Sequence, residues 1–325
     1  RPLRALMALF FALAFAAGCL PMAATPPADT PQPVARRLTI LYTNDEHGWL
    51  VAQTDKDKGT SGGAAEMLGL WQTREGYTAD GPFLVLSGGD MWTGPAISTW
   101  FMGDPAVEAM NLMGYRAAAV GNHEFDFGLE VLRRHAREAN FPYLAANLVE
   151  RGTGEPPDFV RPFVVVEVAG IKVGLIGLAT RATPMTTNPK NVAAFDFLPY
   201  ADALARYAPQ AQAAGAEALI ALAHVCTAEM RSLAPRAGQL GVHVLTAGHC
   251  HEQAAEEVAG LPLIGGGQYL QAYARLDLEV DAATRRVTTG KPAVIRNAAA
   301  AGAGSPDPYL AERVAAWRVE TEKAL

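Results

Sequence analysis

Five apolar stretches of this chain each end in side chains that can bind a metal ion or transfer a proton. The central stretch is Ala117–Val120, which stops at Gly121 and is followed by Asn122, His123, Glu124 and Asp126. A short apolar run bounded in this way is typical of a buried β-strand. In an open α/β sheet, ligands bind beyond the carboxyl ends of the strands. The pattern therefore predicts an α/β fold with its site at the strand ends.

The other four stretches follow the same rule. Residues 38–43 lead to Asp45 and His47, residues 83–86 to Asp90, residues 218–223 to His224, and residues 242–246 to His249 and His251. Mixed histidine, carboxylate and amide sites suit Zn, Mn or Fe. Because these donors outnumber the ligands of one four-coordinate ion, we expect two divalent ions that share a bridging carboxylate.

Composition narrows the class of partner. The chain has 325 residues, of which 50% are hydrophobic, so it can bury the core of one large domain or two small ones. Its net charge is −6 and no basic stripe is evident, which argues against a nucleic-acid polymer as partner. Small phosphorylated substrates handled by metal ions remain compatible with this charge.

The amino-terminal segment predicts export. Arg1 and Arg4 precede an apolar run, Leu6–Ala17, which is shorter than the roughly 20 residues of a membrane span and fits a secretory signal. The run leads to Cys19 and resembles a bacterial lipoprotein signal, in which Cys19 is lipidated. The alternative is an ordinary signal peptide cut near Ala24. We expect a periplasmic or cell-envelope protein that touches the membrane only through Cys19.

The remaining chain divides by composition. Residues 1–19 form the signal, the proline-rich residues 20–36 a tether, residues 37–297 one domain, and residues 298–325 a linker with a final helix, a possible start of a second domain. From Glu256 onward the pattern is hairpin-like, and we expect residues 261–264, 269–280 and 287–295 in an antiparallel part of the second sheet. We also expect Asp104 to cap the helix 104–113, and His135 to be exposed on the helix 129–139. We expect Cys226 and Cys250 to be free buried thiols, and a disulfide between them is the alternative.

The strand-end motifs resemble those of a known superfamily. Asp45-x-His47, Gly89-Asp90, Gly121-Asn122-His123-Glu124, His224 and Gly248-His249-x-His251 are similar to calcineurin-like metallophosphoesterases. Within that superfamily, residues 44–48 and 121–126 resemble the 5'-nucleotidase family of exported bacterial enzymes. The resemblance covers residues 38–297. It implies a four-layer α/β/β/α sandwich with two mixed sheets.

The resemblance also implies a role for each residue. One metal ion would be held by Asp45, His47, Asp90 and His251, and the second by Asp90, Asn122, His224 and His249. His123 would face the phosphate instead of binding a metal, Asp126 would orient His123, and Asn122 would also contact substrate. Arg181 could meet an anionic substrate or could be a plain surface residue. Glu124 is left without a chemical role beyond fixing the turn.

The expected function is therefore that of an exported, monomeric phosphoesterase with two metal ions. It would hydrolyse a nucleotide phosphoester, with UDP-sugars and 2',3'-cyclic nucleotides as further substrates, by attack of a metal-bound hydroxide. One alternative is the thiosulfohydrolase of bacterial sulfur oxidation, which shares the fold but departs from Asn-His-Glu at 122–124. The other is a non-catalytic lipoprotein that binds metal or substrate; it predicts a broken ligand set, whereas this set is intact. Substrate choice stays open because many family members bind the nucleoside with a second, carboxy-terminal domain.

Overall fold

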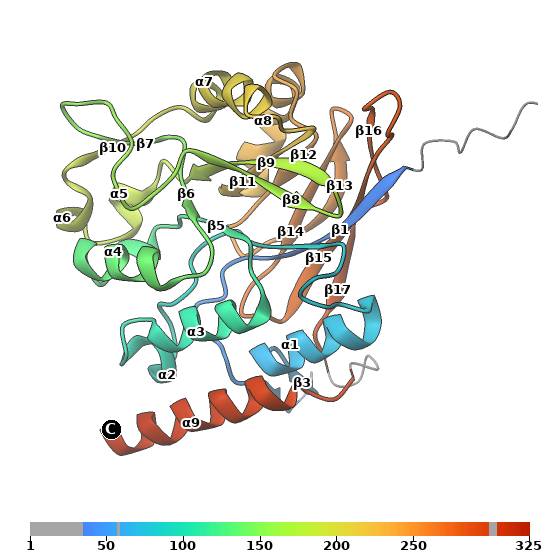
Figure 1. The fold of residues 1–325 in the computed structure, drawn as a ribbon. Helices are drawn as coiled ribbons and strands as arrows, with labels where there is room; N and C mark the ends of the chain where they lie inside the picture. Colours follow the sequence, from blue (N-terminus) through green and yellow to red (C-terminus); the bar gives the residue numbers. More distant parts are fainter. Residues whose placement is uncertain (1–34, 57–58, 299–303) are drawn as a thin grey trace, which may run out of the picture. The chain divides into compact units, whose positions relative to one another are not determined.

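A computed structural model describes residues 35–56, 59–298 and 304–325, and in it two β-sheets pack face to face between helices (Figure 1). The expected signal and most of the tether, including Cys19, lie outside the described residues. Apolar side chains of both sheets form one buried cluster, which contains Ile40 and Leu276 of the first sheet and Leu175 and Ile220 of the second. Separate clusters join each sheet to its helices. These four layers confirm the expected α/β/β/α sandwich.

The first sheet has the strand order β16-β15-β1-β4-β5-β6, and β17 also pairs with β15. Its strands are β1 (Arg36–Thr43), β4 (Phe83–Ser87), β5 (Ala117–Ala119), β6 (Tyr143–Leu144), β15 (Ala272–Val280), β16 (Val287–Thr289) and β17 (Ala293–Arg296). Strands β1, β4, β5 and β6 run parallel, so their carboxyl ends meet at one edge of the sheet.

The placement of residues 269–280 and 287–295 in the second sheet is wrong. Strand β15 pairs antiparallel with β1 in the first sheet, with Leu276 opposite Ile40 and Leu278 opposite Leu38. All four side chains are buried between the sheets. Alternating apolar residues predict a half-buried strand but do not identify its neighbour, because many pairings bury the same face.

The second sheet has the strand order β13-β14-β12-β11-β9-β8. Its strands are β8 (Phe163–Val168), β9 (Ile171–Ala179), β11 (Ala218–His224), β12 (Val244–Thr246), β13 (Gln253–Val258) and β14 (Leu261–Gly266). The four inner strands are parallel, while β8 and β13 pair antiparallel at the two edges. This sheet therefore also gathers the carboxyl ends of its inner strands at one edge.

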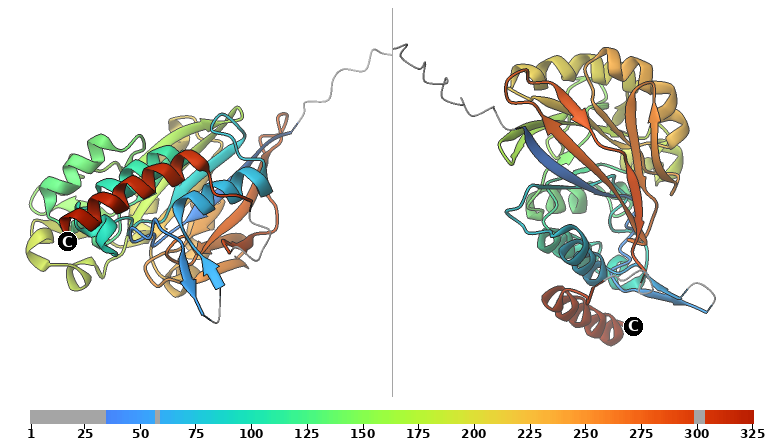
Figure 2. Two further views of the ribbon diagram at one scale, coloured as in Figure 1. Left: turned by 90° about the horizontal axis from the view of Figure 1, so that it is seen from below. Right: turned by 90° about the vertical axis from the view of Figure 1, so that its right-hand side faces the viewer.

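Helices cover the outer face of each sheet (Figure 2). The first sheet packs against α1 (Ala64–Leu70), α3 (Asp104–Met113) and α4 (Leu129–Glu138), and the second against α7 (Tyr200–Ala213) and α8 (Thr227–Gln239). The last helix, α9 (Pro308–Ala324), buries Leu310 and Val314 in the first helical layer. Its Arg313 and Trp317 side chains reach the Glu108 carboxylate of α3 at 2.6 and 2.8 Å.

Several shorter elements extend or correct the sequence-based prediction. Residues 183–197 contain α5 (Thr183–Thr186), α6 (Pro189–Val192) and β10 (Phe195–Phe197), which pairs with β7 (Leu148–Glu150). Strands β2 (Gln53–Asp55) and β3 (Gly59–Ser61) form a small hairpin. Helix α3 is capped by Gly103, and Asp104 is its first residue. The described helices include none with the length and apolar character needed to cross a membrane.

Candidate active site

The seven predicted metal ligands converge where the two sheets end. Asp45 and His47 follow β1, Asp90 follows β4, Asn122 follows β5, His224 ends β11, and His249 and His251 follow β12. Side chains at this place form three groups, and within each group the donor atoms lie within 4.8 Å of one another. The groups are Asp45, His47 and His251; His47, Asp90 and His123; and Asp90, His224 and His249. The sheets therefore bring ligands from distant parts of the sequence to one place.

The first group is centred on two imidazoles. His47 Nε2 lies 3.2 Å from His251 Nε2 and 3.9 Å from Asp45 Oδ1. His47 Nδ1 lies 2.7 Å from the carbonyl oxygen of Thr93, so Nδ1 carries the proton. The lone pair of Nε2 is then directed toward the other donors, as in a metal-binding histidine.

In the second group, a backbone carbonyl oxygen again fixes the orientation of an imidazole. His224 Nδ1 donates to the carbonyl oxygen of Gly88 at 2.7 Å, and its Nε2 faces Asp90 Oδ2 at 3.0 Å and Asn122 Oδ1 at 3.2 Å. The Asn122 amide nitrogen donates to the carbonyl oxygen of Thr186 at 3.1 Å. That bond turns the amide oxygen of Asn122 toward His224.

Asp90 belongs to both groups. Its Oδ2 lies 3.0 Å from His224 Nε2 and 3.9 Å from His47 Nε2, while Oδ1 accepts the backbone N–H of His123 at 2.8 Å. Burial would raise the pKa of Asp90, but the neighbouring His224 and His47 outweigh that cost and hold the pKa below its usual value. Asp90 is thus an ionised carboxylate placed between two clusters of nitrogen donors.

Asp45 provides a test of whether the site fits cations. Its side chain is fully buried, and Oδ2 accepts hydrogen bonds from Asn44 Nδ2 at 2.6 Å and the His249 N–H at 3.0 Å. Its Oδ1 has no hydrogen-bond partner within the described part of the chain. Leaving a buried carboxylate oxygen unsatisfied costs about 1–3 kcal/mol or more. A cation beside Asp45 Oδ1 would remove that cost, so the donor set fits divalent metal ions.

The turns that present the ligands have unusual backbone angles. Five ligands have positive φ: Asp45 at 51°, His47 at 48°, Asp90 at 58°, His249 at 68° and His251 at 57°. Residues other than glycine are uncommon in this region, and such strain persists where the surroundings enforce it. Here the two turns of the first sheet brace each other, because Asp45 N–H donates to Gly89 O at 2.9 Å and His47 N–H to Asp90 O at 2.8 Å.

Glu124 fixes these turns, as the sequence suggested. Its carboxylate accepts the backbone N–H groups of Asp90 at 2.8 Å, Met91 at 2.8 Å and Gly121 at 2.6 Å. Burial raises the pKa of Glu124 to about 7. The backbone of Gly121 lies so close to Asp90 that a Cβ atom on residue 121 would be 2.1 Å from Asp90 Oδ1. Only glycine therefore fits at position 121.

His123 stands at the open side of the site. Its Nδ1 lies 2.6 Å from Asp126 Oδ2, and Asp126 Oδ1 accepts a hydrogen bond from Thr187 Oγ1 at 2.8 Å. The His123 ring lies edge-on to His47, with 5.1 Å between ring centroids, and 33% of its side chain is exposed. The hydrogen bond to Asp126 raises the pKa of His123 to about 9. His123 is therefore a protonated, oriented imidazole beside the metal-ligand cluster.

The expectation of two free thiols is wrong, because Cys226 and Cys250 form a disulfide. Cys226 follows His224 by two residues, and Cys250 lies between His249 and His251. Strands β11 and β12 are parallel neighbours, so the residues after them meet at the same edge. Sequence spacing alone does not report this proximity. The bond ties together two turns that carry ligands.

The structure does not bring every candidate to the site. Arg181 is exposed and lines a hollow with Tyr200, Glu229 and Ser232, none of which is a predicted ligand.

The expectation that His135 is exposed is wrong. Its side chain is fully buried, its Nε2 donates to the carbonyl oxygen of Met102 at 2.9 Å, and its ring packs on Trp92. The charged residues around it in α4 hide this contact from sequence patterns.

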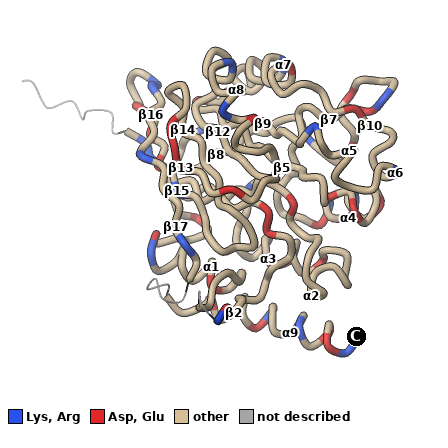
Figure 3. The backbone as a smooth tube through the Cα atoms, turned by 180° about the vertical axis from the view of Figure 1, so that it is seen from behind, with Lys and Arg blue, Asp and Glu red and all other residues tan. Residues whose placement is uncertain are grey.

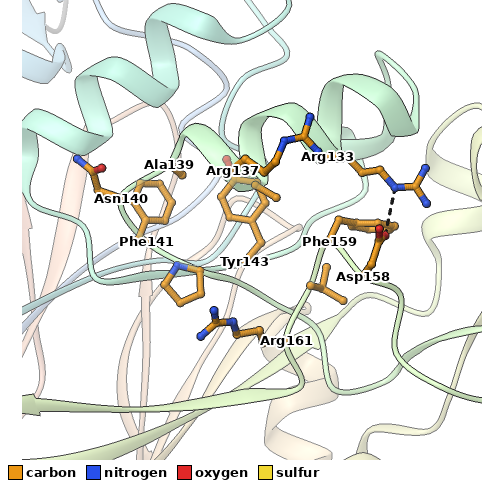
Figure 4. A pocket seen from close by; sticks show the side chains of 12 residues that line it. Arg133, Arg137, Ala139, Asn140, Phe141, Tyr143, Asp158, Phe159 and Arg161 are labelled. Carbon is orange, nitrogen blue, oxygen red and sulfur yellow. Dashed lines mark hydrogen bonds and ion pairs between the residues drawn. The ribbon is translucent and has the colours of Figure 1, made fainter.

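A separate hollow of about 480 Å³ lies between α4 and residues 158–161 (Figure 4). Its polar side chains include Arg133, Arg137 and Arg161, and its apolar side chains include Phe141 and Phe159. No predicted ligand lines it. Basic and acidic residues elsewhere on the described backbone are intermixed in the view of Figure 3. The metal-ligand cluster therefore remains the candidate active site.

Several known proteins that are similar to this chain in sequence are named 5'-nucleotidase. No family model matches the chain. The 5'-nucleotidase of Vibrio cholerae is 40% identical over 164 residues, which are 50% of this chain and 28% of that protein. A snake venom 5'-nucleotidase from Gloydius brevicauda is 34% identical over 221 residues, which are 65% of this chain and 36% of that protein. The chain thus spans about a third of the length of these relatives.

Solved structures share the fold. The 5'-nucleotidase precursor of Thermus thermophilus superposes with a TM-score of 0.76 at 24% identity, over 88% of this chain and 59% of that one. The calcineurin-like phosphoesterase YfkN of Bacillus subtilis superposes with a TM-score of 0.77 at 20% identity, over 90% of this chain and 99% of that one. The sulfate thiohydrolase SoxB of Thermus thermophilus also has this fold, with a TM-score of 0.74 at 19% identity over 88% of this chain and 61% of that one.

The motifs, their convergence at the ends of two facing sheets, and the named relatives agree. The relatives match the chain in sequence well above the level at which a fold alone is shared, and the structural neighbours have the same sandwich. The chain is therefore similar in sequence to 5'-nucleotidases over half to about two thirds of its length, and it has the fold of calcineurin-like phosphoesterases.

Proposed function

We propose that the chain hydrolyses phosphoesters of nucleotides with two divalent cations. The observation that carries the proposal is the position of Asp90 between two donor clusters beside a protonated His123. Asp45, His47, Asp90 and His251 would hold one cation, and Asp90, Asn122, His224 and His249 the other. When bound, such cations neutralise phosphoryl oxygens and make a water molecule nucleophilic at neutral pH. Zn, Mn and Fe all suit this donor set.

His123 and Asp126 would serve the substrate. With Nδ1 bonded to Asp126, His123 presents its Nε2–H to the open side of the site, where it can donate to a phosphoryl oxygen. The same proton can pass to the leaving oxygen as the ester bond breaks. Asp126 keeps the imidazole protonated and oriented, and Thr187 holds Asp126. We place Asn122 against the same phosphate and omit Arg181 from the site.

A substrate panel tests this function. The purified chain, loaded with Mn or Zn, is assayed with 5'-AMP, UDP-glucose, 2',3'-cyclic AMP and p-nitrophenyl phosphate, and its bound metal is measured in the same sample. We expect hydrolysis of at least one nucleotide ester. Protein that holds its metals and turns over no ester would overturn the proposal.

His123→Ala separates the two roles open to this residue. General acid–base groups contribute about 10²- to 10⁴-fold to rate, so kcat should fall by that factor while the metal content stays unchanged. Loss of a metal ion in His123→Ala would instead identify His123 as a ligand, because its ring also lies within 4.8 Å of donors on His47 and Asp90.

We further propose that the protein is exported and monomeric, with residues 37–297 as its catalytic domain. The apolar run before Cys19 supports export, and so does the Cys226–Cys250 disulfide, since disulfides persist in oxidising compartments. Cell fractionation tests the location, labelling with a radioactive fatty acid tests lipidation of Cys19, and light scattering tests the monomer. The thiosulfohydrolase alternative has only the shared fold in its favour.

A further inference from the structure

A second hollow adjoins the first metal-ligand group. Its volume is about 680 Å³, within the range of small-molecule sites. It is lined by Trp49, Gln53, Thr54, Asp55, Ser61, Gln253, Gln268, Tyr269, Gln271, Arg296 and Ala298. The mechanism proposed above uses none of these residues.

Tyr269 connects this hollow to the metal ligands. Its ring meets the rings of His47 and His251 edge-on, with centroid distances of 5.6 and 5.5 Å. Its backbone N–H donates to the carbonyl oxygen of Asp45 at 2.8 Å. Tyr269 itself has a positive φ of 57°, so the surroundings hold it in an unfavourable conformation. The neighbouring Gln268 also lines the hollow.

The aromatic wall consists of two rings already stacked on each other. Trp49 and Tyr269 have centroids 4.9 Å apart and planes inclined by 29°. A flat nucleobase cannot enter between rings that are in contact. A ring with C–H groups on its face can pack against the outer surface of such a wall, because the face of an aromatic ring is electron-rich.

The other side chains supply hydrogen bonds without a large net charge. Four glutamines line the hollow. Gln53 Nε2 donates to the carbonyl oxygen of Val51 at 2.9 Å, and each of the other three amides carries both donors and an acceptor. Thr54 and Ser61 add hydroxyl groups, and Arg296 and Asp55 have opposite charges. Alternating donors and acceptors of this kind match a ring that carries several hydroxyl groups.

We propose that this hollow binds the sugar ring of a substrate whose phosphate lies at the metal-ligand cluster. The inference rests on the proposed function, because it assigns the organic part of the same substrate. Tyr269 lines the hollow and its ring also contacts His47 and His251, so the hollow begins one side chain away from the metal-ligand cluster. The chain would then select sugar phosphates over esters without hydroxyl groups, through Trp49, Gln271 and Arg296.

Kinetics of two substrates test the proposal. The metal-loaded full chain is assayed with ribose 5-phosphate and with p-nitrophenyl phosphate, which has no sugar. Because loss of an aromatic contact weakens binding, Trp49→Ala should raise KM for ribose 5-phosphate by about fivefold. Its kcat, its metal content and its kcat/KM for p-nitrophenyl phosphate should stay within about twofold of the parent. Trp49→Phe should retain most of the affinity.

Two further variants keep the test decisive. Trp100→Ala is the matched control, because Trp100 is 53% exposed and does not line this hollow. If Trp100→Ala raises KM for ribose 5-phosphate and Trp49→Ala does not, the sugar binds elsewhere and the proposal is wrong. Gln271→Ala provides the same readout if Trp49→Ala fails to fold, and an unchanged KM in that variant overturns the proposal.

A binding measurement distinguishes this inference from the proposed function. Calorimetric titration of the metal-loaded chain with ribose 5-phosphate reports affinity without turnover. If the chain binds ribose 5-phosphate through Trp49 but hydrolyses no ester, the proposed function fails and the sugar site stands. If it hydrolyses esters and Trp49→Ala changes neither affinity nor KM for the sugar phosphate, the sugar site fails alone.

Discussion

His123 Nδ1 lies 2.6 Å from Asp126 Oδ2, and this pair joins the metal-ligand cluster to the position proposed for the reacting phosphate. The residue before His123 contributes an amide oxygen to that cluster, while His123 itself faces the open side. In the proposed function, one turn after β5 would therefore serve both the metal ions and the substrate.

Asp126→Asn should change the pH dependence of the reaction. Asp126 raises the pKa of His123 to about 9 from a usual value of 6.5, so protonated His123 is present below pH 9 and is lost as pH rises through that value. Without the carboxylate, this loss should begin closer to pH 6.5. A pH profile of kcat/KM should show the basic limb shifted to lower pH in Asp126→Asn, with metal content unchanged. An unshifted limb would show that His123 is not the titrating group.

Substitution of a proposed metal ligand should lower the number of bound metal ions, by an amount that depends on whether the residue contacts one ion or both. Because Asp90 faces donors of both groups, Asp90→Ala should lose both ions, whereas His251→Ala should lose one. Elemental analysis of protein dialysed against excess Zn measures the number bound. Exposed Glu130→Ala on α4 provides a control that should keep the parent stoichiometry. Equal losses in Asp90→Ala and His251→Ala would contradict a shared carboxylate.

Glu124→Ala should destabilise the fold more than a surface substitution does. Three backbone N–H groups would lose their acceptor in the interior, which costs about 1–3 kcal/mol or more. Denaturant unfolding measures the difference, with Glu130→Ala expected within about 0.5 kcal/mol of the parent. A Glu124→Ala variant as stable as the parent would mean that water or another group replaces the carboxylate.

Breaking the Cys226–Cys250 disulfide should affect both stability and metal binding. The bond closes a loop with a sequence separation of 24 residues, for which about 3 kcal/mol of stabilisation is typical. Because it also holds the turns of His224, His249 and His251, the Cys226→Ser/Cys250→Ser variant should bind Zn about 10- to 100-fold more weakly. Competition with a chelator measures the affinity. A loss of stability with unchanged Zn affinity would limit the disulfide to a role in folding.

Glu217 should contribute stability only above acidic pH. Hydrogen bonds from Arg36, at 2.7 and 3.0 Å, hold the pKa of Glu217 at about 2, below its usual value of 4.5. A lowered pKa means that the contribution is present above pH 4.5 and is lost as pH falls toward 2. Glu217→Gln should therefore cost about 1 kcal/mol at pH 7 and nothing near pH 2. Thermal melts at both pH values check this, and a difference that persists at pH 2 would contradict it.

The convergence of the candidate ligands could be predicted from the sequence because parallel strands place their carboxyl ends together. Apolar runs mark the strands, and Asp90 or His224 directly after a run marks the edge. The pairing of β15 with β1 could not be predicted, since Leu276 fits the inner face of either sheet. The contact between Cys226 and Cys250 likewise depends on which strands are neighbours.

Some features of the site leave little trace in the sequence. The positive φ angles of Asp45 and His251 arise from turns braced by backbone hydrogen bonds to other segments. Tyr269 lies 222 residues from His47 in the sequence, yet their rings touch, and neither Tyr269 nor Trp49 carries a recognisable motif. Such contacts follow from the assembled sandwich, which brings distant loops to the same edge.

The most direct test of the account is a crystal structure of the Zn-loaded chain with anomalous scattering measured at the Zn edge. We predict two peaks flanking the Asp90 carboxylate, about 3.5–4 Å apart, with Asp45, His47 and His251 around one and Asn122, His224 and His249 around the other. A single peak, or peaks that do not share Asp90, would contradict it.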